Sequence, residues 1–173
     1  KKYSGENTMV LGIIYESIQR WIPPAIKLSA TGNIFNDKSI DPETGNIISI
    51  EIPDYLLIQM EMENNIRGSF LISEVGLHSP TPTITIYGTK GSLKVEFIHN
   101  GKLWYGSRMN ESLNEVPIKA QDKGLWRVEE EFINTIKGIE KIKLTTFKDG
   151  VDYMRFTQAV MESYRENGIT KYL

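Results

Sequence analysis

The order of elements along this 173-residue chain predicts an α+β fold with an open, predominantly antiparallel sheet and helices packed on one face. Three observations support it. Apolar residues recur at helical spacing at the start of the chain, they alternate with polar residues through its middle, and they return to helical spacing in the last third. Strands segregated from helices are typical of α+β domains, whereas alternating strands and helices would indicate a parallel sheet.

The first predicted helix covers Glu6 to Ile22, where one apolar stripe is spaced for burial. It ends at Pro23-Pro24 because proline lacks the N–H group and restrains the residue before it. Gly12 in the middle of this helix costs about 1 kcal/mol relative to alanine. It therefore indicates close packing or the passage of a ligand.

Alternation from Ala25 to about Phe35 predicts a half-buried strand, and a polar loop follows from Asn36 to Asn46. A short strand is expected over Ile47 to Ile52. Two longer strands, Tyr55 to Glu63 and Ile66 to Val75, flank Asn64-Asn65, and asparagine tolerates the positive φ of a tight hairpin turn.

The stretch ITIYGTKGSLKVEF, Ile84 to Phe97, contains a glycine-bounded tetrapeptide with one lysine. A phosphate-binding loop would lead into a helix N-terminus, where free N–H groups bind anions. Here alternating residues follow Gly91, so we predict a β-hairpin turn instead. A further strand is expected over Lys102 to Tyr105, and a polar connection from Ser107 to Lys123.

The last third predicts two helices. Leu125 to Lys137 carries one apolar stripe and is closed by Gly138, and Lys148 to Asn167 carries another and is closed by Gly168. Thr145 or Thr146 is the expected N-cap of the second helix. A final short strand is expected over Ile169 to Leu173.

The composition excludes several kinds of site. The net charge of −2 offers no basic face for nucleic acid and no polybasic patch for anionic lipid, so neither partner is predicted. No apolar run approaches the roughly 20 residues that span a bilayer. Because the chain has no cysteine, thiolate nucleophiles and cysteine-based metal sites are absent from it, which fits a reducing compartment.

Catalytic groups are sparse. Only two histidines occur, His78 and His99, too few for a zinc site, and no metal site is predicted. His99 lies in a turn, and His78 follows a strand end, where residues that line sites often occur. Glu129 to Glu131 is interpreted as a solvated first helical turn. From the residues alone, the chemistry remains unassigned.

Several stretches, taken in order, resemble the C-terminal domain of the Gfo/Idh/MocA family of NAD(P)-dependent oxidoreductases. That domain has a glycine-containing helix ending in arginine–tryptophan, a hairpin with the wording i-x-i-x-G-t-x-G-s-l, a helix with a glutamate–phenylalanine core, and a last helix with a serine before a closing glycine. The corresponding residues here are Gly12 with Arg20-Trp21, Ile84 to Leu93, Trp126 with Glu129 to Phe132, and Ser163 with Gly168.

The resemblance implies a dihydrodipicolinate-reductase-like C-terminal domain over residues 1–173, truncated on its N-terminal side. Family members bind NAD or NADP mainly through a separate Rossmann domain with a glycine-rich loop and an EKP segment. Neither motif occurs here, so no cofactor-binding residue is assigned and the isolated chain is expected to be inactive.

The chain also departs from the family. Many members carry D-x-G-x-H-x-x-D on the first helix, and with Gly12 and Trp21 as the register those positions are Val10, Ile14 and Ser17. None transfers a proton as histidine does, so the catalytic residue is unknown. Tyr15 is adjacent, about 100° around the helix, and would take part only after a local shift. The substrate-binding candidates are Ile14, Tyr15, Ser17 and His78.

The resemblance thus implies a substrate-binding and oligomerisation domain of an enzyme acting on a sugar, inositol or related polyol. The expected assembly is a homodimer or homotetramer through the open sheet face, in the cytoplasm. The alternative is a non-catalytic sensor or scaffold protein of the same fold, which the missing histidine favours. Residues upstream of Lys1 would separate the two, since an enzyme needs the Rossmann and EKP motifs.

Overall fold

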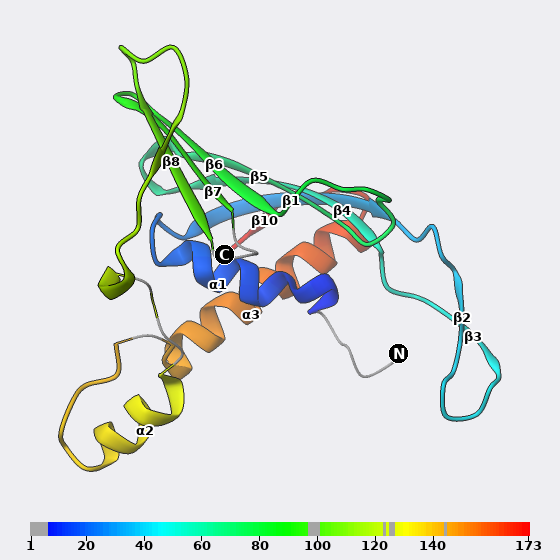
Figure 1. The fold of residues 1–173 in the computed structure, drawn as a ribbon. Helices are drawn as coiled ribbons and strands as arrows, with labels where there is room; N and C mark the ends of the chain where they lie inside the picture. The colour runs from blue at the N-terminus through cyan, green and yellow to red at the C-terminus, as the bar shows by residue number, and fades with distance from the viewer. Residues whose placement is uncertain (1–6, 97–100, 123, 125–126, 144) are drawn as a thin grey trace. The chain divides into compact units, whose positions relative to one another are not determined.

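The computed structural model describes residues 7–96, 101–122, 124, 127–143 and 145–173 (Figure 1). The chain divides into two compact units. One comprises Lys1–Gly76 with Lys137–Leu173, and the other comprises Leu77–Ile136. His99 and Trp126 lie outside the described residues.

The first unit is built on a four-stranded antiparallel sheet of order β10-β1-β4-β5. Its strands are β1 (Ala25–Asn33), β4 (Tyr55–Met62), β5 (Arg67–Ser73) and β10 (Lys171–Tyr172). Helices α1 (Leu11–Gln19) and α3 (Phe147–Arg165) lie together against one face of this sheet (Figure 1). The predicted fold class, an open antiparallel sheet with helices on one face, is confirmed.

The core of this unit lies between the sheet and the two helices. Tyr15 of α1 stacks on Phe156 of α3 with ring centroids 3.6 Å apart, and Phe70 of β5 meets both rings edge-on. The inward side chains of β4 fill the remaining space, and all are nearly inaccessible to solvent: Leu56, Ile58, Met60 and Met62. Residues two apart on β4 share this face because a strand alternates its side chains.

The first helix is shorter than predicted. A 3₁₀ turn, η1 (Thr8–Val10), precedes α1, and Met9 and Val10 have φ values of 49° and 53°. These left-handed residues interrupt the predicted helix, and the Gly12 N–H donates to Asn7 Oδ1 at 2.7 Å. A Cβ on Gly12 would stand 3.0 Å from the Tyr153 ring, so its glycine allows close packing against α3.

The segment predicted as a polar loop contains a strand. β2 (Lys38–Ile40) pairs with β3 (Ile47–Ser49) in a two-stranded hairpin that leaves the sheet between β1 and β4 (Figure 1). Its tip is closed by hydrogen bonds from Asp41 N–H to Asn46 O and from Gly45 N–H to Asp41 O, both 2.8 Å. We call residues 34–53 the arm.

The predicted turn between β4 and β5 is confirmed. It forms a single 3₁₀ turn, η2 (Glu63–Asn65), and both Asn64 and Asn65 have φ values of 59°. Asparagine adopts this region more readily than other non-glycine residues, so its side chain suits the turn.

The second unit contains the sheet β6-β7-β8-β9. Its elements are β6 (Thr83–Gly88), β7 (Gly91–Glu96), β8 (Lys102–Ser107), β9 (Asn114–Val116), η3 (Ala120–Asp122) and α2 (Val128–Ile136). Gly88 pairs with Gly91, so GTKG is the predicted hairpin turn. β9 lies inside the connection predicted to be irregular. Glu131 is buried, so the prediction that all three glutamates are solvated was wrong there.

Helix α3 begins with the predicted N-cap. Thr146 Oγ1 accepts from the Asp149 N–H at 3.2 Å, and Asp149 Oδ2 accepts from the Thr146 N–H at 2.7 Å, a reciprocal capping box. Hydrogen bonds from the Thr146 backbone and hydroxyl lower the pKa of the Asp149 carboxyl.

Ser163 joins α3 to both neighbouring strands. Its buried hydroxyl accepts from the Ala30 N–H at 2.8 Å and donates to Ile169 O at 2.7 Å. After it the helix ends at Gly168, which has a φ of 87° and lies against Thr31. The serine and glycine therefore fix the end of α3 on β1.

Replacing Ser163 with alanine is expected to lower the free energy of unfolding by about 1–3 kcal/mol, because the buried Ala30 N–H loses its acceptor. Urea unfolding followed by circular dichroism measures the change. Thr157→Val is the matched control, since Thr157 is equally buried but donates only to Met154 O of its own helix. Equal losses in the two variants would contradict the role of the Ser163 bridge.

Candidate functional site

Helix α1 presents two opposite faces. Leu11, Tyr15 and Ile18 are buried in the core. Val10, Ile13, Ile14, Ser17 and Trp21 share the opposite side at 100° per residue, and we call these five residues the outer face of α1. Val10, Ile13 and Trp21 are 58%, 62% and 49% exposed, and Ile14 and Ser17 are half-buried. The outer face is therefore a mostly apolar surface with one hydroxyl.

The structure separates the three candidates on α1. Ile14 and Ser17 lie together on the outer face, and the Ser17 hydroxyl donates to Ile13 O at 3.0 Å. Tyr15 points into the core, where its hydroxyl accepts from the Ala25 N–H at 2.9 Å. Burial raises the pKa of the Tyr15 phenol above its ordinary value of 10.0. In this arrangement Tyr15 joins α1 to β1.

His78, the fourth candidate, belongs to the second unit. It is exposed and has a φ of 57°, in the segment between β5 and β6. Non-glycine residues in this region are uncommon and occur often near functional sites. Whether His78 shares a site with Ile14 and Ser17 stays a prediction.

Tyr15 and Ser17 are expected to respond differently to loss of their hydroxyls. Tyr15→Phe leaves the Ala25 N–H without its acceptor and should lower the free energy of unfolding by about 1–2 kcal/mol. Ser17→Ala should change it by less than about 0.5 kcal/mol. Urea unfolding measures both. Unchanged stability of Tyr15→Phe, with weaker substrate binding in the full-length protein, would contradict the structural role of this hydroxyl.

A polar network that sequence reasoning missed joins the end of α1 to the start of α3. Arg20 pairs with Glu16 and reaches Thr145 Oγ1 at 3.2 Å, and the Thr145 hydroxyl donates to Glu16 Oε1 at 2.6 Å. A cavity of about 240 Å³ lies beside it, lined also by Gln19, Lys143 and Asp149. The Glu16–Arg20 spacing was visible in the sequence, but nothing indicated Thr145.

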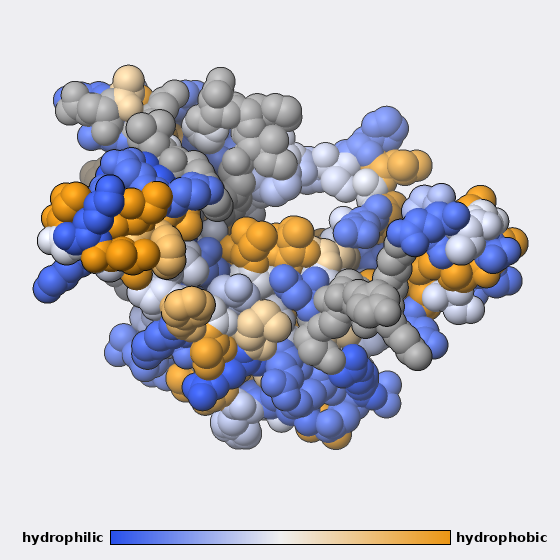
Figure 2. Space-filling view, turned by 90° about the horizontal axis from the view of Figure 1, so that it is seen from below, coloured by the Kyte–Doolittle hydropathy of each residue, from blue (hydrophilic) through white to orange (hydrophobic). Residues whose placement is uncertain are grey.

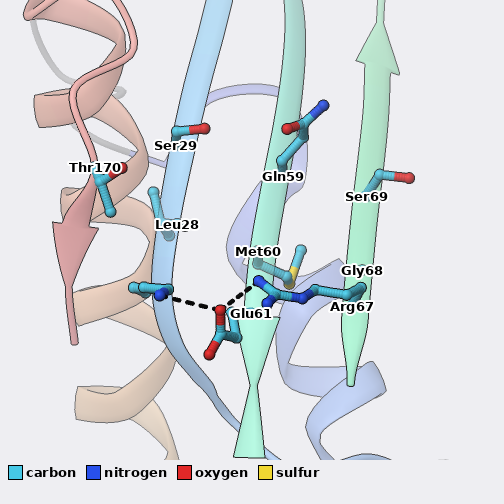
Figure 3. Close-up of a pocket in the computed structure, with 10 residues that line it drawn as sticks. Leu28, Ser29, Gln59, Met60, Glu61, Arg67, Gly68, Ser69 and Thr170 are labelled. Carbon is cyan, nitrogen blue, oxygen red and sulfur yellow. Dashed lines mark ion pairs between the residues drawn. The ribbon is translucent and has the colours of Figure 1, made fainter. Parts of the chain in front are cut away.

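A second cavity, of about 380 Å³, lies on the side of the β10-β1-β4-β5 sheet opposite the helices (Figure 3). Glu61 stands at its floor between Lys27, 3.0 Å away, and Arg67. The hydrogen bond from Lys27, and after it the charge of Arg67, lower the pKa of the Glu61 carboxyl despite its partial burial. Hydroxyl and amide side chains line the rest: Ser29, Gln59, Ser69 and Thr170.

Apolar side chains are also exposed elsewhere. Phe132, Ile133 and Ile136 of α2 are 58%, 49% and 71% exposed, and hydrophobic surface covers this helix at the left edge of Figure 2. Within the described ranges, no three acidic or histidine side chains gather as a metal site would require. In the same ranges, no helix combines the length and the hydrophobicity needed to cross a bilayer.

Comparison with solved structures supports the fold. Levoglucosan dehydrogenase in complex with NADH and L-sorbose is 15% identical with a TM-score of 0.76, covering 94% of this chain and 48% of that one. The transcriptional regulator Gal80p from Kluyveromyces lactis is 22% identical with a TM-score of 0.69, covering 93% and 44%. Aldose-aldose oxidoreductase from Caulobacter crescentus, complexed with glycerol, is 13% identical with a TM-score of 0.63, covering 87% and 42%.

The chain spans about half the length of these structures or less. A search of curated protein sequences finds no match. The sequence profile described as "Oxidoreductase family, C-terminal alpha/beta domain" matches residues 23–172, which is most of the chain. The chain therefore belongs to the Gfo/Idh/MocA oxidoreductase family, as its C-terminal domain.

Proposed function

We propose that this chain is the substrate-binding and oligomerisation domain of an NAD(P)-dependent oxidoreductase acting on a sugar, inositol or related polyol. Family membership over residues 23–172 is the observation that carries the proposal. NAD or NADP would be bound mainly by a domain outside this chain. When bound, the nicotinamide supplies the hydride chemistry at a hydroxyl-bearing carbon.

The outer face of α1 is the proposed substrate surface. Ser17 uses its own proton in the bond to Ile13 O, so its oxygen can still accept from a substrate hydroxyl. Ile14 beside it offers an apolar contact to the carbon skeleton. His78 is the third proposed contact and would bring the one imidazole among the candidates.

The second candidate function is a non-catalytic sensor or scaffold. Val10, Ile14 and Ser17 offer no group that transfers a proton at neutral pH, which is the specific observation in its favour. A transcriptional regulator also occurs among the proteins of similar fold. Under this alternative the same face of α1 would bind a ligand without converting it.

Titration of the full-length protein with NADH and NADPH, followed by nicotinamide fluorescence, tests the proposal. We expect one dinucleotide to bind, and a panel of sugars and polyols to include one that reduces NAD or NADP. Binding of the dinucleotide and of a polyol without turnover would favour the sensor or scaffold. Absence of dinucleotide binding would overturn the proposed oxidoreductase.

Assembly and location belong to the same proposal. A homodimer or homotetramer would form through the sheet face that the helices leave open. The absence of cysteine supports a reducing, cytoplasmic location. The expected partners are a small sugar or polyol and further copies of the chain, with neither nucleic acid nor membrane among them.

A further inference from the structure

The open face of the β10-β1-β4-β5 sheet is poor in charge. In β1, β4 and β5, twelve side chains point away from the helices: Lys27, Ser29, Thr31, Asn33, Tyr55, Leu57, Gln59, Glu61, Arg67, Ser69, Leu71 and Ser73. We call these twelve the outer sheet face. Three are charged, in a chain that is 24% charged overall. Depletion of charge at the centre is typical of protein interfaces, so this face suits a protein partner.

Cross-strand pairing arranges the outer sheet face in four rows. Lys27, Glu61 and Arg67 form the charged row at one end, and an uncharged row of Ser29, Gln59 and Ser69 follows. The next row is Thr31 with Leu57 and Leu71, which are 36% and 64% exposed. Asn33, Tyr55 and Ser73 complete the far end. The apolar row thus lies inside the face, and the charges lie at its rim.

The two ends of this sheet differ in charge. Glu61 pairs with both Lys27 and Arg67, which leaves the charged row with a net charge of +1 (Figure 3). The arm leaves the opposite end, between Asn33 and Tyr55. It carries four carboxylates against one lysine, a net charge of −3, from Asp37, Asp41, Glu43, Glu51 and Lys38. Charges at the two ends are therefore opposite in sign.

We propose that a second copy of this chain covers the outer sheet face, related by a two-fold axis perpendicular to the strands at the Leu57–Leu71 row. This axis places the arm of each copy at the charged row of the other. A two-fold axis parallel to the strands would instead bring the two acidic arms together, and the two charged rows together. Ends of opposite sign attract within a Debye length of about 8–10 Å, which favours the first arrangement.

The proposal rests on the oligomerisation part of the proposed function and adds the orientation of the two copies. It predicts which residues face each other. Leu57 lies at the axis and meets its own copy, while Gln59 faces Tyr55 of the second copy. Gln59 is then four residues from its counterpart along the strand, about 14 Å, in addition to the sheet spacing of about 10 Å.

Single cysteines in the full-length protein test this arrangement, in a background without other cysteines. Facing sheets are too far apart for a disulfide, so a bifunctional maleimide spanning about 10 Å is used. We expect Leu57→Cys to cross-link to itself, and mixed Gln59→Cys and Tyr55→Cys proteins to cross-link to each other. Efficient cross-linking of Gln59→Cys to itself would overturn the orientation.

Leu71→Arg tests the face independently. Size-exclusion chromatography with light scattering should show a dimer that dissociates at least tenfold more readily than the unsubstituted protein. Leu77→Arg is the control, because Leu77 is 89% exposed and outside the outer sheet face, and it should leave the dimer unchanged. A monomeric unsubstituted protein that still binds a dinucleotide would overturn this inference and leave the proposed oxidoreductase standing. A dimer without dinucleotide binding would do the reverse.

Discussion

Replacing Phe156 with alanine is expected to lower the free energy of unfolding by about 3–5 kcal/mol, the largest effect that we predict for a single side chain. Phe156 is fully buried on α3, stacks on Tyr15, and meets Phe70 edge-on with ring centroids 6.0 Å apart. Its removal would leave a cavity between α1, α3 and the sheet. The surrounding rings belong to three different elements, so they cannot easily close it.

Urea unfolding, followed by tryptophan fluorescence and circular dichroism, measures this loss. Phe147→Ala is the matched control, because Phe147 lies on the same helix but is 95% exposed. Its substitution should change stability by less than about 0.5 kcal/mol. A loss below about 1 kcal/mol for Phe156→Ala would contradict the packing described for this core.

Replacing Asp54 with alanine is expected to lower the free energy of unfolding by about 2–4 kcal/mol at pH 7. Its carboxylate is 9% exposed and accepts from the Phe35 N–H at 2.8 Å. It also accepts from the Asn36 N–H and Nδ2, both at 2.9 Å. Without it, two backbone donors at the base of the arm would lose their acceptors. Asp41→Ala is the control, since its exposed carboxylate accepts only from the Glu43 N–H.

The contribution of Asp54 depends on pH. Burial alone raises the pKa of its carboxyl, but the hydrogen bonds from Phe35 and Asn36 outweigh burial and hold the pKa below its ordinary value of 3.8. A carboxyl with a lowered pKa stabilises the fold above its unfolded pKa, and the stabilisation is lost as the pH falls through the folded pKa. Urea unfolding at several pH values should therefore show a constant difference from Asp54→Asn above about pH 5 that narrows below pH 4. A difference that widens below pH 4 would contradict this assignment.

Elements with strong local signals were predicted well. Alternation fixed the long strands, and the glycine pair around Thr89-Lys90 indicated a hairpin because a strand pattern followed it. The Thr146 N-cap was one of two predicted positions, and its partner Asp149 lies three residues on, as a capping box requires. Each of these signals lies within a few residues of the feature that it predicts.

Features that depend on distant residues were not predicted. The three-residue strand β2 forms because β3 pairs with it, and three residues are too few to show an alternation. The start of α1 depends on left-handed residues at Met9 and Val10, which apolar periodicity does not reveal. At the candidate site, helical geometry placed Ile14 and Ser17 on one face and Tyr15 off it. Thr145, by contrast, reaches Glu16 across 129 positions of sequence.

The junction between the sheet and the arm has a consequence for how this domain can change over evolutionary time. Asn33 pairs with Tyr55 across β1 and β4, and Asp54 closes the chain back onto Phe35 and Asn36 directly beyond that pair. The entry and the exit of the arm are thus held together whatever lies between them. Lengthening such a closed segment costs little, about 0.6 kcal/mol for each doubling. Insertions and deletions between Asn36 and Pro53 can therefore alter the reach and charge of the arm without disturbing the core.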